Sequence, residues 1–77
     1  GYLVEFHPRQ SQRPSHDLSH SGEELIFVLE GQIEAEVAGE KISLKPGDSL
    51  FFRSTEPHTF FNPHDQIARA VAVVYPF

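Results

Sequence analysis

Two histidines and one glutamate have the types and the spacing of residues that could bind a metal ion or a small polar ligand. Glu24 follows His20 by four residues, and Asn62 follows His58 by four. Because side chains alternate across a strand, Glu24 would share a face with Ile26, and His58 with Asn62. If both faces point into one interior, a carboxylate and two imidazoles meet in an apolar chamber. A carboxylate is costly there unless it is paired, and a divalent metal is one way to stabilise it.

Two imidazoles and one carboxylate suit a divalent ion of zinc, iron, manganese or nickel. Without an ion, the same side chains could bind the carboxylate, amine or carbonyl group of a small effector through hydrogen bonds. His20, Glu24 and His58 are therefore candidate ligands of one metal and also candidate contacts of a small molecule. We add Phe60, on the face of His58, and Arg53, a cation expected at the chamber mouth, as candidate ligand-binding residues. No residue is assigned a catalytic role.

The same residues have structural interpretations as well. His20 and His58 could be ordinary buried or rim histidines, and Glu24 could be a hairpin residue in water. The other three histidines are predicted to lie on the surface or in loops: His7, His16 and His64.

Short β-strands are the elements that would position these side chains. Helical periodicity is absent, and turn signals recur at short intervals, which is typical of a barrel or sandwich. Strands are predicted over residues 2–6, 24–30, 33–37, 41–45, 49–53, 58–62 and 67–75, with residues 9–19 as a loop or an exposed edge strand. Closing or doubling the sheet protects its edges, so we expect an all-β fold, a small antiparallel β-barrel or jelly roll.

The strand over residues 24–30 is apolar at every interior position, which predicts that both of its faces are buried. Leu25, Phe27 and Leu29 would form a second apolar face behind the one that carries Glu24. That face could bury itself against a partner subunit, so we expect a homodimer, and a dimerisation module is one alternative role.

Length, charge and composition narrow the classes of function. The chain has 77 residues, a formal net charge of −5 and no cysteine. It is expected to form one domain over residues 1–77, without a disulfide or thiolate metal site. An acidic domain repels phosphate backbones, so it should not bind nucleic acid by itself. Its longest apolar stretch, residues 25–29, is too short to span a membrane, and we expect a cytoplasmic protein.

Two segments resemble the conserved motifs of the cupin superfamily. The first motif has two histidines separated by one residue, then a glutamate, and after six further residues a glycine; residues 20–31 match its second histidine, glutamate and glycine. Residues 46–62 resemble the second motif, with its histidine at His58 and its asparagine at Asn62. The resemblance covers about residues 19–74 and implies a small conserved barrel.

The match departs from the metal-binding pattern at the first motif. Cupins that bind metal use three histidines and one glutamate, but Leu18 stands at the first histidine. In the second motif, Arg53 and Thr55 replace a proline and a glycine. The resemblance therefore implies a site with three candidate ligands, or a hydrogen-bonded polar cluster without metal.

Four stretches are similar to cupin domains at the C-terminus of bacterial helix-turn-helix transcriptional regulators: residues 20–31, 44–52, 57–63 and 68–74. This similarity implies an effector sensor excised from a longer protein, which contacts DNA only through a missing N-terminal domain. A metal-dependent enzyme, either a dioxygenase or an isomerase, is the alternative. In that case a metal held by His20, Glu24 and His58 would polarise a substrate oxygen or activate dioxygen.

Overall fold

The computed structural model describes residues 1–12 and 22–76, and the regular elements in this part of the chain are β-strands. They are β1 (Tyr2–Phe6), β2 (Ser11–Gln12), β3 (Gly22–Glu30), β4 (Ile33–Val37), β5 (Glu40–Leu44), β6 (Ser49–Arg53), β7 (His58–Phe61) and β8 (Ala68–Pro76). All the predicted strands are present, within about two residues at each end. The short β2 confirms an edge strand in the segment predicted as a loop or an exposed edge. None of the described residues belongs to a helix that is long and apolar enough to cross a membrane.

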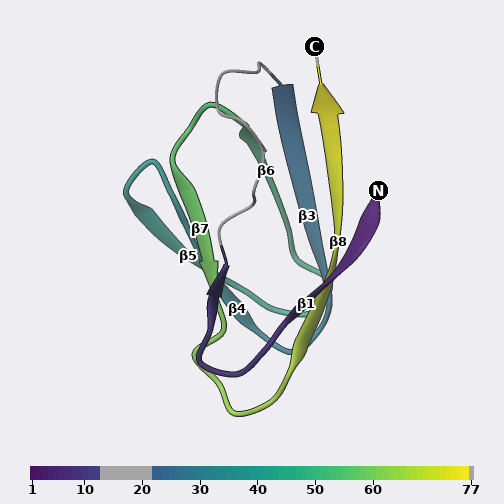
Figure 1. Ribbon diagram of the computed structural model, residues 1–77, viewed down its shortest axis with the longest axis vertical. Helices are drawn as coiled ribbons and strands as arrows, with labels where there is room; N and C mark the ends of the chain where they lie inside the picture. The colour runs from purple at the N-terminus through teal and green to yellow at the C-terminus, as the bar shows by residue number, and fades with distance from the viewer. Residues whose placement is uncertain (13–21, 77) are drawn as a thin grey trace.

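The strands form two four-stranded sheets, in the orders β1-β8-β3-β6 and β2-β7-β4-β5, with every pairing antiparallel. Figure 1 shows the chain passing repeatedly from one sheet to the other, so that strands distant in sequence lie beside each other. The pairing of β3 with both β6 and β8 is one example. The predicted all-β barrel or jelly roll is confirmed.

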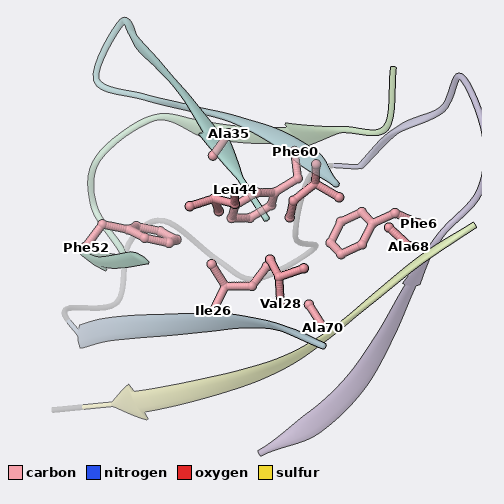
Figure 2. Packing of buried hydrophobic residues seen from close by; sticks show 10 residues of the cluster. Phe6, Ile26, Val28, Ala35, Leu44, Phe52, Phe60, Ala68 and Ala70 are labelled. Carbon is pink, nitrogen blue, oxygen red and sulfur yellow. The ribbon is translucent and has the colours of Figure 1, made fainter. Parts of the chain in front are cut away.

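Apolar side chains from the inner faces of both sheets fill the interior. Ile26 and Val28 from β3 point toward Leu44 and Phe60 of the opposite sheet (Figure 2). Phe52 lies at one end of this core and Phe6 at the other, as Figure 2 also shows. Ala68 and Ala70 on β8 are fully buried; their small side chains let the two sheets approach closely.

Strand β3 separates its side chains sharply between two environments. On the inner face, Glu24, Ile26 and Val28 are at most 6% exposed, whereas on the outer face Phe27 is 40% and Leu29 48% exposed. The prediction that both faces of this strand are buried is therefore wrong within this chain. The reason is that the opposite sheet covers only the inner face, and no second layer of the described chain covers the outer one.

Gly31, the turn residue after β3, occupies a position that only glycine fits well. Its φ is +76°, and a Cβ built there would lie 2.7 Å from the Cβ of Ala68. Any side chain would both strain the backbone and collide with β8. The absence of a side chain at Gly31 thus allows the β3–β4 turn to pack directly against Ala68 of β8.

Asn62 closes the Phe6 end of the barrel from within. It is 0% exposed, and its Nδ2 donates hydrogen bonds to the Phe6 carbonyl at 2.9 Å and to the Gln66 carbonyl at 2.8 Å. Its Oδ1 accepts a hydrogen bond from the His64 amide at 3.0 Å. Through its bonds to His64 and Gln66, Asn62 fixes the turn that follows β7.

Candidate functional site

The fold brings Glu24 and His58 together at the end of the barrel opposite Asn62. Glu24 lies on β3 and His58 begins β7, so each comes from a different sheet. Their Oε2 and Nε2 atoms are 3.7 Å apart, and the side chains are only 7% and 3% exposed, respectively. This separation exceeds an ordinary hydrogen bond and lies within the range of an ion pair. We call these two residues the acid–imidazole pair.

The backbone of the β6–β7 turn fixes the orientation of the His58 ring. Nδ1 of His58 lies 2.6 Å from the Glu56 carbonyl oxygen. A carbonyl can only accept, so Nδ1 carries a hydrogen and donates it. Nε2 is therefore the ring nitrogen directed at Glu24. If the ring is neutral, Nε2 points a lone pair at the Glu24 carboxylate. If the ring is charged, Nε2 carries a proton and points it at the same carboxylate.

Aromatic rings separate the pair from the centre of the barrel. Phe52 lies opposite Glu24 in the β3–β6 register. Its ring centroid is 4.7 Å from that of His58, and the Phe60 centroid is 6.3 Å from His58. These apolar neighbours lower the local polarity around two ionisable groups, which strengthens electrostatic interactions at this position.

Ser54 is a further polar residue at this end of the barrel, and the sequence analysis missed it. The residue is 4% exposed, and its Oγ has no hydrogen-bond partner among the described residues. The Ser54 amide donates to the Gly22 carbonyl at 3.0 Å, which continues the β3–β6 pairing past Arg53. Alternation from the buried Phe52 would have placed Ser54 on the inner side of the sheet.

The structure does not gather every predicted site residue around the pair. Phe60 does lie beside His58, as a core residue that is 5% exposed. Arg53 is exposed on the outer face of β6, where it lies opposite Glu23. His20, the third predicted ligand, lies outside the described residues, as does His16. His7 and His64 are exposed, which confirms their prediction as surface residues.

Among the residues that the structure describes, no three or more histidine, cysteine, aspartate or glutamate side chains form a metal-binding group. The acid–imidazole pair supplies one oxygen and one nitrogen donor. Two ligands that each lie about 2.0–2.2 Å from one ion are themselves about 3–4 Å apart, so the observed 3.7 Å suits a shared ion. A metal-ligating histidine also typically donates its other ring N–H to a backbone carbonyl, as His58 does here.

Two of the hollows lined by described residues lie away from the pair. One, of about 320 Å³, lies on the outer side of β4, β5 and β7 beside Glu36, Lys41 and Phe61. The other, of about 360 Å³, lies among loops at the Asn62 end, beside Gln32 and His64.

Comparison with known proteins identifies a family. The family model described as "Cupin domain" matches residues 2–74 of the chain. A search of curated proteins finds no significant match.

Solved structures share the fold over nearly the whole chain. The protein TT1209 from Thermus thermophilus is 28% identical with a TM-score of 0.83, covering 96% of this chain and 69% of that one. A predicted oxalate decarboxylase from Thermotoga maritima is 22% identical with a TM-score of 0.82, covering 97% of this chain and 64% of that one. The Cupin_2 domain of an XRE family transcriptional regulator from Enterobacter cloacae is 21% identical with a TM-score of 0.68, covering 97% of this chain and 70% of that one. The chain thus spans less than two thirds of the Thermotoga protein.

Proposed function

This chain belongs to the cupin domain family, and from that premise we propose that it binds a small molecule at the acid–imidazole pair and serves as the effector sensor of a bacterial transcriptional regulator. The observation that carries the proposal is the position of Glu24 and His58, which lie 3.7 Å apart and buried at one end of an apolar barrel. Small-molecule sites typically combine an apolar lining with a few placed polar groups.

The pair is better suited to recognition than to holding the fold together. Burying two ionisable groups carries a desolvation cost that their attraction often does no more than offset. An apolar pair of similar size would fill the same space without that cost. Retaining Glu24 and His58 therefore favours a polar ligand whose own groups interact with them.

A divalent metal of zinc, iron, manganese or nickel is the cofactor that these donors would accept, with His20 as the third protein ligand. Such an ion would supply Lewis-acid polarisation of a ligand oxygen. Glu24 would provide negative charge toward the ion, and the Glu56 carbonyl would hold His58 in the tautomer whose Nε2 can coordinate. Ser54 would offer a buried hydroxyl to the ligand at the same end of the barrel.

The regulatory role is supported by the resemblance to regulator cupin domains and by the shared fold with the XRE family domain. With a net charge of −5, this domain would leave DNA binding to another part of a cytoplasmic protein. A metal-dependent enzyme is the second candidate, because the fold is also that of a predicted oxalate decarboxylase and because the bond from His58 Nδ1 to a backbone carbonyl is one that metal-ligating histidines commonly make.

The test is metal uptake followed by ligand screening on the 77-residue chain. Purified chain is dialysed against Zn²⁺, Ni²⁺, Mn²⁺ or, without oxygen, Fe²⁺, and bound metal is counted by mass spectrometry. The melting temperature is then measured with and without a panel of small carboxylic acids, amines and sugars. We expect a panel member to raise the melting temperature of the wild type, and His58→Ala to abolish the rise.

His64→Ala is the matched control, because it removes an exposed histidine far from the pair. It should keep the wild-type response. A chain that responds to no metal and no panel member, or a His58→Ala variant that responds like the wild type, would contradict the proposal. Turnover of a stabilising compound by the metal-loaded chain would select the enzyme instead of the sensor.

A further inference from the structure

A surface hollow lies over strands β4, β5 and β7, on the side of the barrel that the second sheet forms (Figure 1). Its volume of about 320 Å³ falls at the lower end of the range found for small-ligand sites. The groups in its lining that can contact a ligand are an aromatic ring, two carboxylates, an ammonium group and a hydroxyl, from Phe61, Glu34, Glu36, Lys41 and Thr59. The acid–imidazole pair is not part of this lining, so the two sites can be tested separately.

Strand register places the aromatic ring of the hollow beside a carboxylate. Phe61 lies directly opposite Glu34 in the β4–β7 pairing, and Thr59 lies opposite Glu36. Residues that face each other across two antiparallel strands have Cβ atoms about 4.5–5.5 Å apart. Phe61 and Glu34 are both half-buried, so a group that enters the hollow meets an apolar ring and a negative charge together.

The carboxylates of the hollow are not neutralised by the protein itself. Neither Glu34 nor Glu36 forms an ion pair with another residue that the structure describes, although Lys41 lies directly opposite Glu36. On the other sheet, by contrast, Arg69 bonds to two glutamates at 3.0 and 2.7 Å. The negative charge of the hollow is therefore available to a cation from outside.

A guanidinium group matches this lining better than an ammonium group does. It is planar, so it stacks on an aromatic ring, and it can donate two parallel hydrogen bonds to one carboxylate. Stacked on Phe61, it would lie next to Glu34. A cation over an aromatic face is attracted by the ring as well as by the neighbouring charge. The lining thus favours arginine among the cationic side chains.

The spacing of the two carboxylates favours an extended polypeptide as the molecule that carries the arginine. Glu34 and Glu36 are two residues apart on β4, so they project to the same side, about 6.6 Å apart along the strand. Two arginines separated by one residue in an extended peptide share a side and have the same repeat. We propose that the hollow docks an extended segment of a partner protein in which two arginines are separated by one residue.

Lys41 determines which part of the hollow holds the first arginine. It lies on the β5 side of β4, opposite Glu36, whereas Phe61 lies on the β7 side, opposite Glu34. Its ammonium group repels an incoming cation and weakens the attraction of Glu36. The first guanidinium group therefore binds between Phe61 and Glu34, and the second, weaker contact is made with Glu36.

The experiment is an NMR titration of the nitrogen-15-labelled chain with the peptide acetyl-Gly-Arg-Gly-Arg-Gly-amide at about 50 mM salt, where surface charges are only partly screened. We expect amide shifts to change on β4 and β7 around the hollow, with a dissociation constant of about 1 mM or lower. The isomer acetyl-Gly-Arg-Arg-Gly-Gly-amide is the matched control. It has the same charge, but its adjacent arginines point to opposite sides of an extended chain, so it should bind at least about threefold more weakly.

Variants of the chain identify the groups that bind. Glu34→Gln should weaken binding about fivefold, and Phe61→Leu, which removes the ring but keeps an apolar side chain, about threefold. Lys41→Gln should strengthen binding about twofold, because it removes a like charge. Glu40→Gln is the charge-matched control, since it removes the same charge from the same sheet but lies outside the lining. It should change the affinity by less than about 1.5-fold.

The same spectra show whether each variant is folded, and Glu36→Gln replaces Glu34→Gln if that variant is not. No binding, or shifts confined to other surfaces, would overturn the proposal. Equal affinity for the two peptide isomers would exclude the extended segment as the occupant. Equal weakening by Glu34→Gln and Glu40→Gln would show that the peptide responds only to net charge, and this result would overturn the proposal as well.

Discussion

The two ends of the barrel each bury polar side chains, and they use them differently. At the Phe6 end, the Asn62 amide donates to two carbonyls and accepts from one amide, all between 2.8 and 3.0 Å. At the Phe52 end, Glu24 and His58 approach only to 3.7 Å across the two sheets. Both sites are almost fully buried, so burial does not distinguish them. They differ in whether the side chains can carry charge and in the groups that these side chains approach.

Asn62 is neutral, and its bonds go to backbone groups that the fold itself provides. Such a residue stabilises one conformation and has little hydrogen-bonding capacity left to offer a ligand. Glu24 and His58 are ionisable, and their separation leaves a shared ion or a ligand group room to interact with both. The comparison therefore predicts that substitutions at the Asn62 end mainly change stability, and that those at the Glu24 end mainly change binding.

The largest effect is expected for Asn62→Ala. The substitution leaves two carbonyls and one amide without their partner, which should lower the free energy of unfolding by about 3 kcal/mol or more. Urea denaturation measures the loss. Gln66→Ala is the control because that side chain is exposed and the bond from Asn62 goes to the Gln66 backbone carbonyl, which the substitution retains. A decrease in the free energy of unfolding of less than about 1 kcal/mol would show that the Asn62 hydrogen bonds do not stabilise the Phe6 end of the barrel.

Gly31→Ala should cost about 2 kcal/mol, because a Cβ there combines a left-handed φ with a 2.7 Å clash against β8. Gly47→Ala separates these two causes, since Gly47 also has a positive φ but has open space around its Cβ position. We expect Gly47→Ala to cost about half as much in the same denaturation experiment. Equal losses for the two variants would show that the close approach to Ala68 contributes nothing.

In contrast to Asn62→Ala, Glu24→Gln should change ligand binding more than it changes stability. It retains the shape of the side chain while removing its charge, so the free energy of unfolding should change by about 1 kcal/mol or less. Binding of Ni²⁺ or Zn²⁺, measured by calorimetry, should weaken by at least about tenfold. Glu34→Gln removes a charge from the opposite sheet and should bind like the wild type. An unchanged affinity in Glu24→Gln would remove the basis for a metal at this end.

The smallest effect on stability is expected for Ser54→Ala. Because Ser54 Oγ is buried without a hydrogen-bond partner in the described structure, its removal should leave stability unchanged or raise it by less than about 1 kcal/mol. Any compound found to stabilise the wild type should then stabilise this variant less, as thermal shift would show. A clear loss of stability without ligand would place Ser54 with Asn62, as a structural residue.

Strand positions and the family could be predicted from the sequence because both depend on local patterns. Alternation of apolar and polar residues marked β4 and β5, and the turn signal Pro46-Gly47-Asp48 marked the start of β6. The resemblance to cupins, which the family match confirms, was carried by the motif residues His20, Glu24, Gly31, His58 and Asn62. Two of the three hydrogen-bond partners of Asn62 belong to the turn that directly follows it, so this part of its role is also local in the sequence.

Other features depend on contacts between residues distant in sequence. Both faces of the β3 segment are equally apolar, so periodicity could not tell which face the second sheet covers and which face stays exposed. Arg53 follows Phe52 directly, and alternation across β6 turned it to the outside, where Glu23 lies opposite.

By itself, the sequence determined a set of short antiparallel strands and named Glu24 and His58 as partners, because strand formation and motif spacing are properties of neighbouring residues. Only the tertiary structure decided that the two side chains meet at 3.7 Å from different sheets and that Ser54 is buried at the same end. It also decided that one apolar face remains open. These outcomes follow from how two sheets pack, and packing joins residues far apart in the chain, which no local pattern encodes.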